Sequence, residues 1–136
     1  KDVLIETEPN IIELLDLKFG YCELVLAGLN NQSIDDLGHN ITVATKYWNS
    51  TIQYFRNRGL KINPVKLYGA VELAPTTGVA DIISDLTATG ATLKENNLSI
   101  IETVFSSTAR LVANKVSINT CHEQINDIYS KLQKIL

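Results

Sequence analysis

The stretch from Glu72 to Leu93, ELAPTTGVADIISDLTATGATL, constrains what this chain can fold into more than any other part of the sequence. It contains a short apolar run that carries a carboxylate, Asp85, close to its end. A turn rich in Thr comes next, and the helix-forming residues 93–95 follow the turn. This order predicts a strand, a hydroxyl-rich turn and the start of a helix.

The turn from Ala88 to Thr92 has the features of a phosphate-binding loop. The N–H groups at the start of a helix have no partner inside the helix and carry a partial positive charge, so they suit a phosphate. Gly90 lets the backbone approach a ligand closely, and the hydroxyls of Thr89 and Thr92 can add donors. Asp85, at the end of the strand, can accept hydrogen bonds from ribose hydroxyls. A phosphate site beside a ribose site indicates a phosphoribosyl ligand.

Each of these features also has a structural explanation. Thr and Gly are common in turns, so the loop could be an ordinary connection between a strand and a helix. It lacks the Gly-Lys-Ser/Thr of a Walker loop and the three glycines of a dinucleotide fingerprint. Glu72 lies thirteen residues before Asp85 and could face the same cleft, or it could be a solvated glutamate that interacts with a helix dipole.

Strands alternate with helices along the rest of the chain, which predicts an α/β fold with a largely parallel sheet. Residues 100–113 are long for one strand, and their alternation slips near Ser106, which indicates a bulge or, as we prefer, a passage between two sheets. The other strands are expected at 21–27, 41–44, 62–67, with Pro64 at a sheet edge, and 80–86.

Two helices carry sequence features that define their ends. The first is expected to begin at an Asn49 cap and to end just before Gly59. The last is expected to begin with a capping box formed by Thr120 and Glu123. An apolar stripe with helical spacing follows on this last helix, and we expect it to belong to a core or a subunit interface. Its members are Cys121, Ile125, Ile128, Leu132 and Ile135.

The composition of the chain excludes some classes of binding partner. The 136 residues carry a formal net charge of −3 and no basic stripe, which argues against nonspecific binding of nucleic acid. No apolar run approaches the about 20 residues of a membrane span, and no signal peptide opens the chain, so we expect a cytoplasmic protein without a membrane partner. Cys22 and Cys121 lack the spacing of a zinc site or a disulfide framework and are expected to be buried, reduced thiols.

One pattern of residues resembles the ATP phosphoribosyltransferase family, which catalyses the first step of histidine biosynthesis. The flanking segments 19–27, 43–47, 54–55, 69–75 and 93–98 resemble it too, so the similarity covers nearly the whole chain. The pattern itself, without a gap, is Glu72, Gly78, Ala80, Ile83, Asp85, Leu86, Thr89, Gly90, Thr92 and Leu93.

The resemblance implies a two-lobed α/β fold like that of periplasmic binding proteins, with the active site in the cleft between the lobes. The enzyme joins a ring nitrogen of the adenine of ATP to the anomeric carbon of phosphoribosyl pyrophosphate and releases pyrophosphate together with Mg²⁺. Glu72 and Asp85 would be the catalytic carboxylates, with Asp85 on the ribose hydroxyls and Glu72 near the ribose or the magnesium ion. The 5-phosphate would be held by the loop residues Ala88, Thr89, Gly90, Ala91 and Thr92.

The resemblance also implies a domain organisation. Residues 1–20 and 106–136 would be remnants of the first lobe, and residues 21–105 would form the second lobe. Lys1 to Leu4 resemble the segment that closes a preceding stretch in the family, so most of the first lobe, with its ATP-binding and pyrophosphate-binding cations, is expected to be missing here. This fragment alone would then be inactive.

The resemblance points to the short form of the enzyme, expected as a homodimer in a larger assembly with a regulatory subunit related to histidyl-tRNA synthetase. Two other functions remain open. The chain could be a phosphoribosyl-binding fragment that performs no chemistry, because most of one lobe is expected to be absent. It could also be an assembly domain, which the apolar stripe on the final helix would suit.

Overall fold

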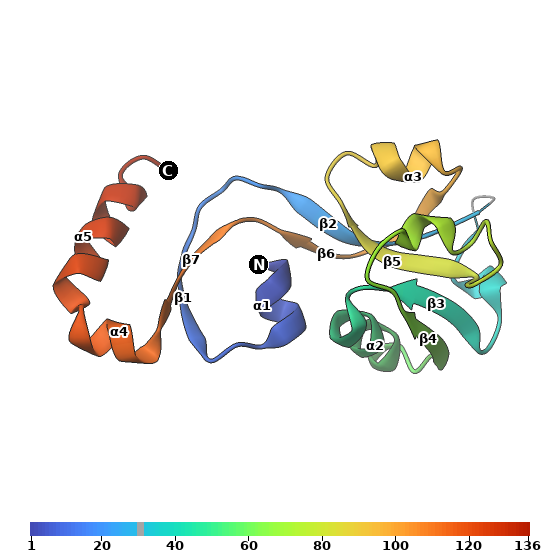
Figure 1. Cartoon of the computed structure of the whole chain (residues 1–136), viewed down its shortest axis with the longest axis horizontal. Coiled ribbons are helices and arrows are strands. Elements are labelled where there is room, and N and C mark those ends of the chain that lie inside the picture. The colour runs from blue at the N-terminus through green and yellow to red at the C-terminus, as the bar shows by residue number, and fades with distance from the viewer. Residues whose placement is uncertain (30–31) are drawn as a thin grey trace. The chain divides into compact units, whose positions relative to one another are not determined.

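The computed structural model describes residues 1–29 and 32–136. The chain divides into two compact units. One unit comprises Lys1–Tyr21 and Ser107–Leu136, and the other comprises Cys22–Ser106. We call them the discontinuous unit and the central unit; Figure 1 labels their elements. The assignment of residues 1–20 with 106–136 and of residues 21–105 to two lobes stays a prediction.

The central unit is built on a five-stranded sheet with the strand order β4-β3-β5-β2-β6. Strand β3 pairs in parallel with β4 and β5, whereas β2 pairs with β5 in the antiparallel direction. The strands are β2 (Cys22–Gly28), β3 (Ile41–Thr45), β4 (Ile62–Lys66), β5 (Ile82–Thr87) and β6 (Ser99–Ser107).

The sheet is therefore mixed: β4, β3 and β5 run parallel, as the sequence predicted, and β2 is an antiparallel strand that the sequence did not predict. In the described part of the connection between β2 and β3, residues 29 and 32–40, the chain forms the 3₁₀ turn η1 (Asp35–Leu37) and no α-helix. Pro64 lies in β4, which is the edge strand that the sequence indicated.

Alternating side chains supply a core on each face of the sheet. Helix α2 (Trp48–Asn57) lies on one face, and the 3₁₀ turn η2 (Val71–Leu73) with α3 (Ala91–Glu95) lies on the other (Figure 1). The buried side chains on the α2 face are Leu26, Ile41, Val43, Phe55 and Ile82. Those on the opposite face are Val25, Ala27, Ala44, Val71, Ala74, Ala80, Ile83, Leu93 and Leu98.

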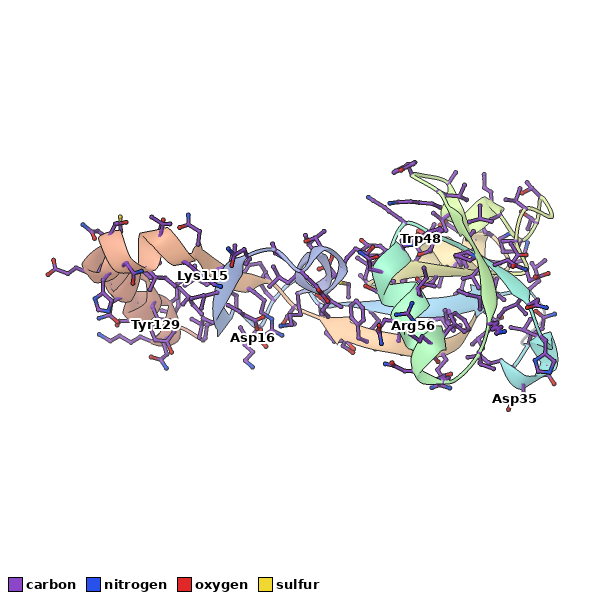
Figure 2. All side chains as sticks on the ribbon, turned by 90° about the horizontal axis from the view of Figure 1, so that it is seen from below. Asp16, Asp35, Trp48, Arg56, Lys115 and Tyr129 are labelled. Atoms are coloured by element: carbon purple, nitrogen blue, oxygen red, sulfur yellow. The ribbon has the colours of Figure 1, made fainter. Side chains whose placement is uncertain are left out.

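Helix α2 confirms one predicted boundary and corrects the other. Its N-cap is Tyr47, and Asn49 lies inside the first turn, so the predicted Asn49 cap was wrong. The Tyr47 N–H donates to the Thr45 hydroxyl at 2.8 Å, and the N-cap lies two residues before the predicted Asn49. Gly59 follows the helix with a φ of 69°, as expected for a residue just past a helix end. Trp48, half-buried, and Arg56 belong to this helix (Figure 2).

The discontinuous unit contains a two-stranded antiparallel sheet of β1 (Ile11–Asp16) and β7 (Arg110–Asn114). Its helices are α1 (Asp2–Thr7), α4 (Lys115–Thr120) and α5 (His122–Gln133). Because β6 and β7 belong to different sheets, residues 100–113 do pass from one sheet to another, which confirms the preferred interpretation of this segment.

The predicted capping box of the last helix was wrong. Thr120 ends α4, and its hydroxyl donates back to the Val116 carbonyl oxygen at 3.1 Å. Cys121 is the N-cap of α5, and its free thiol is exposed rather than buried, whereas the free thiol of Cys22 is half-buried. Within residues 1–29 and 32–136, no helix is long and apolar enough to cross a membrane.

Candidate functional site

A pocket of about 320 Å³ opens in the central unit where β5 ends and α3 begins. It brings together the two carboxylates that the sequence singled out, Glu72 and Asp85, with the threonine-rich loop. Of the predicted loop residues, Gly90 alone is absent from the lining; it is the N-cap of α3. The lining residues are Glu72, Asp85, Leu86, Thr87, Ala88, Thr89, Ala91, Thr92 and Leu93.

The alternation of β5 explains how Asp85 reaches this pocket. Ile82 packs on the α2 side of the sheet, and Ile83 packs on the side of η2 and α3. Ser84, which contacts Thr51 of α2, and Asp85 continue this alternation, so Asp85 faces η2 and α3. Glu72 comes from η2, whose neighbouring residue Val71 is buried in the core of the same face.

Asp85 is half-buried, and several groups act on its protonation. Burial is the largest effect and raises the pKa of the carboxyl above its usual range. A hydrogen bond from the Leu86 N–H to Oδ1, 2.9 Å long, lowers the pKa, the charge of Glu72 raises it, and the charge of Lys46 lowers it. The net direction is upward. Hydroxyl donors from a ligand would favour the ionised form, because hydrogen bonds to a carboxylate stabilise its charge.

The loop between β5 and α3 confirms the predicted order of strand, turn and helix start. The Gly90 N–H donates to the Thr87 hydroxyl oxygen at 2.8 Å, and the Ala91 N–H donates to the Thr89 hydroxyl oxygen at 3.4 Å. Gly90 has a φ of 73°, a left-handed conformation that favours glycine. The side chains of Thr89 and Thr92 are exposed, so their hydroxyls are accessible to a ligand in the pocket.

Sequence reasoning did not include Lys46 among the site residues. The register of the parallel strands pairs Thr45 with Ser84, so the residues that follow them, Lys46 and Asp85, come next at the same edge of the sheet. Lys46 is exposed and close enough for its charge to act on Asp85. The sequence predicted both strands but not that they are neighbours, and only the pairing brings this cation to the site.

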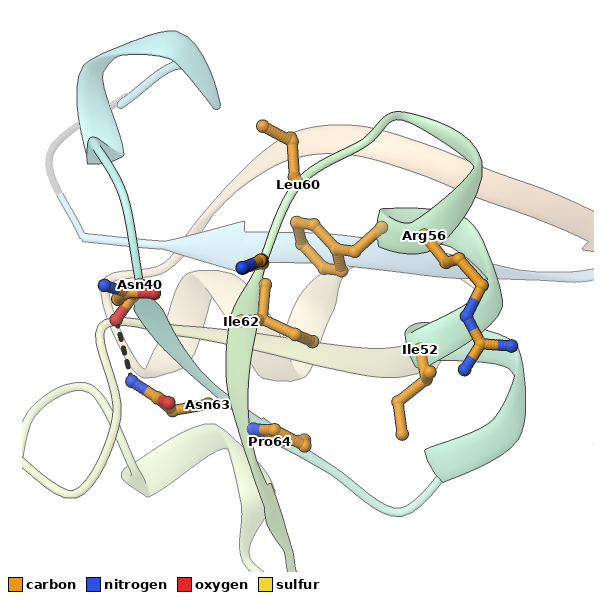
Figure 3. A pocket seen from close by; sticks show the side chains of 9 residues that line it. Asn40, Ile52, Arg56, Leu60, Ile62, Asn63 and Pro64 are labelled. Atoms are coloured by element: carbon orange, nitrogen blue, oxygen red, sulfur yellow. Dashed lines mark hydrogen bonds between the residues drawn. The ribbon is translucent and has the colours of Figure 1, made fainter.

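A second, larger pocket of about 450 Å³ lies between α2 and β4 and contains none of the predicted site residues. Ile52, Ile62 and Pro64 give it an apolar wall, and Arg56 and Asn63 lie at its sides (Figure 3). The Asn63 side-chain amide donates to the Asn40 carbonyl oxygen at 3.0 Å. In the described part of the chain, no three His, Cys, Asp or Glu side chains are grouped so that they could hold a metal ion.

Comparisons with known proteins show which family this chain resembles. A family model described as HisG, ATP phosphoribosyltransferase, matches residues 1–134. A protein named ATP phosphoribosyltransferase from Caldanaerobacter subterraneus is 45% identical over 136 residues, which are 100% of this chain and 64% of that protein. Another of the same name from Syntrophotalea carbinolica is 45% identical and covered to the same extents. The chain thus spans about 64% of the length of these relatives.

Solved structures give the same family and a wider fold group. The ATP phosphoribosyl transferase (HisG:HisZ) complex from Thermotoga maritima matches with a TM-score of 0.88 and 37% identity, over 99% of this chain and 66% of that chain. The holo form of ArgBP from the same organism matches with a TM-score of 0.59 at 18% identity, over 90% of this chain and 57% of that chain. The second match supports a fold of the periplasmic-binding-protein type and no more.

Proposed function

Because this chain belongs to the ATP phosphoribosyltransferase family, we propose that it carries the phosphoribosyl-binding part of an enzyme that transfers the phosphoribosyl group of phosphoribosyl pyrophosphate to ATP. This reaction releases pyrophosphate and is the first step of histidine biosynthesis. One observation carries the proposal. Glu72, Asp85 and four residues of the loop, all chosen from the sequence, line one pocket; the four are Ala88, Thr89, Ala91 and Thr92.

Each group at the pocket has a chemical role in this proposal. The hydroxyls of Thr89 and Thr92, with the backbone of the loop, hold the 5-phosphate, because hydroxyl and N–H donors suit phosphate oxygens. Asp85 accepts hydrogen bonds from the ribose hydroxyls. As pyrophosphate leaves, the sugar gains positive charge, and the nearby carboxylates of Asp85 and Glu72 stabilise it. Catalysis then needs placed charges and a fixed sugar rather than a nucleophilic side chain.

Magnesium enters the proposal with the substrate. The described residues contain no three-ligand cluster, and Mg²⁺ is commonly bound by substrate phosphates with one or two carboxylates at most. Two carboxylates beside a phosphate site are compatible with this mode of binding, and we assign the ion no protein ligand. Mg²⁺ would neutralise the charge of the departing pyrophosphate.

The remaining partners are inferred from the family. The matched complex from Thermotoga maritima is named for two components, HisG and HisZ, which supports a regulatory subunit that assembles with this chain. We expect a homodimer within that assembly, located in the cytoplasm, without nucleic-acid or membrane partners.

A noncatalytic phosphoribosyl-binding fragment is the second candidate function, and the share of the relatives that the chain spans favours it. The chain covers about 64% of their length, so groups that bind ATP and pyrophosphate could lie outside it. Formation of phosphoribosyl-ATP by these 136 residues alone would exclude this candidate.

Titration of phosphoribosyl pyrophosphate into the complete gene product tests the leading proposal. Asp85→Asn and Thr92→Val should each raise the dissociation constant about tenfold or more, because each removes a charged or hydroxyl contact to the ligand. Asp81→Asn and Thr76→Val are matched controls, since both residues lie outside the pocket. Equal affinities for the wild type and the two pocket variants would show that the site is assigned wrongly.

A further inference from the structure

Three hydroxyl side chains form a buried polar cluster beneath the proposed site. Thr45, Thr51 and Ser84 are each 0% exposed. The Thr51 hydroxyl oxygen lies 2.8 Å from the Ser84 hydroxyl and 3.2 Å from the Thr45 hydroxyl. Buried hydroxyls without partners are costly, so a fully connected cluster of this kind fixes the geometry of the groups that take part.

The cluster connects three elements through the backbone. The Thr45 hydroxyl donates to the Ser84 carbonyl oxygen at 2.7 Å and joins the end of β3 to β5. The same hydroxyl accepts the Tyr47 N–H at 2.8 Å, and the Thr51 hydroxyl lies 2.6 Å from the Tyr47 carbonyl oxygen. The turn that contains Lys46 is thus held at both ends, by the strand before it and by the first turn of α2.

The residues next to the cluster, Lys46 and Asp85, are two of the charged groups of the site. Lys46 follows Thr45, Asp85 follows Ser84, and Thr45 pairs with Ser84 in the parallel register. Because successive side chains of a strand point to opposite faces, Asp85 lies on the face of η2 and α3 when Ser84 lies on the face of α2. Lys46 is the first residue after β3, and its charge acts on Asp85. The bonds of the cluster therefore fix the backbone at Lys46 and at Asp85 relative to each other.

We infer that Thr45, Thr51 and Ser84 are positioning residues that hold Lys46 beside Asp85, so that the Lys46 ammonium group binds an anionic group of the substrate. An ammonium group is a compact charge that suits a phosphate or pyrophosphate oxygen. This inference rests on the proposed function, because it assigns Lys46 to the anionic part of phosphoribosyl pyrophosphate. Thr51 contributes through the hydroxyl alone and touches no substrate.

Thr51→Val in the complete gene product is the first test, because valine keeps the shape of the side chain and removes the hydroxyl. The dissociation constant and KM for phosphoribosyl pyrophosphate should rise about tenfold, while KM for ATP stays unchanged. Thr51→Ser keeps the hydroxyl and should restore both values to within about twofold. Thr120→Val is a matched control, because the Thr120 hydroxyl makes the same kind of bond to the carbonyl four residues earlier, in α4.

Lys46→Ala is the second test, and it does not depend on whether Thr51→Val folds, because Lys46 is exposed. It should weaken binding of phosphoribosyl pyrophosphate about tenfold or more. In the Lys46→Ala background, Thr51→Val should have little further effect, since both changes remove the same contact.

The outcomes of these binding experiments distinguish a failure of the inference about Lys46 from a failure of the proposed function. A wild type that binds no phosphoribosyl pyrophosphate would overturn the proposed function. A wild type that binds, together with a Lys46→Ala variant of equal affinity, would overturn the inference. Additive effects of the two substitutions would also overturn it, because Thr51 would then act independently of Lys46.

Discussion

The ionised form of Asp85 is needed for the proposed function but destabilises the fold. Its pKa is raised, with burial as the largest cause. A carboxyl whose pKa is higher in the folded than in the unfolded state stabilises the fold below its unfolded pKa. This contribution is lost as the pH rises through the folded pKa. At pH 7 the ionised group is therefore a cost, which we expect substrate hydroxyls to offset.

The first prediction follows from the raised pKa of Asp85. Asp85→Asn should raise the free energy of unfolding at pH 7, and the gain should shrink as the pH falls to about 4, near the unfolded pKa of an Asp. Asparagine can still accept the Leu86 N–H, so the local bond is kept. Urea unfolding at the two pH values measures the difference. A variant less stable than the wild type at pH 7 would contradict the prediction.

Gly90 carries the second residue-scale prediction. A Cβ at this position would meet no atom within 4 Å, so Gly90→Ala has a purely conformational cost from its φ of 73°. We expect the free energy of unfolding to fall by about 1 kcal/mol. Gly69→Ala is the control, because Gly69 has equally open space without a positive φ. Equal effects of the two changes in thermal unfolding would show that backbone strain is not the cause.

At the scale of elements, the strand, turn and helix around the site could be predicted from the sequence, because the local preferences of these residues match the structure that they form. The apolar run of β5, the glycine that caps α3 and the buried Leu93 all favour the same local structure. The two predicted helix caps failed for a different reason. Asn and Thr side chains bond to the backbone in several ways, and Thr120 bonds back to Val116 instead of capping the next helix.

The contacts between elements could not be predicted from the sequence. The direction of β2 depends on its pairing with β5, which no local pattern specifies. The register of β3 with β5 brings Lys46 near Asp85. The same register and the packing of α2 bring together the hydroxyls of Thr45, Thr51 and Ser84. The loop and its carboxylates could be found from the sequence, whereas the cation and the cluster beneath them could not.

At the scale of the molecule, the two units differ in how much they bury. The buried apolar side chains, such as Leu24, Ile83 and Phe55, belong to the central unit. In the described part of the discontinuous unit, Ser107 is the one buried residue, and Ile128 and Ile135 of the predicted apolar stripe are 50% and 78% exposed. A two-stranded sheet without a core is marginally stable in water.

Hydrogen exchange on this 136-residue chain should therefore separate the units. Amides of β3 and β5, which lie inside the five-stranded sheet, should exchange slowest, and amides of β1 and β7 should exchange much faster. Equal protection of the two sheets would mean that the discontinuous unit is stabilised by contacts other than burial.

Hydrogen exchange on the complete gene product, with and without phosphoribosyl pyrophosphate, tests the site assignment most directly. The ligand should slow exchange in residues 85–93, where the two carboxylates and the threonine loop meet, and should leave residues 52–64 around the larger pocket unchanged. Protection centred on residues 52–64, or no protection in residues 85–93 at saturating ligand, would contradict the assignment of the phosphoribosyl site.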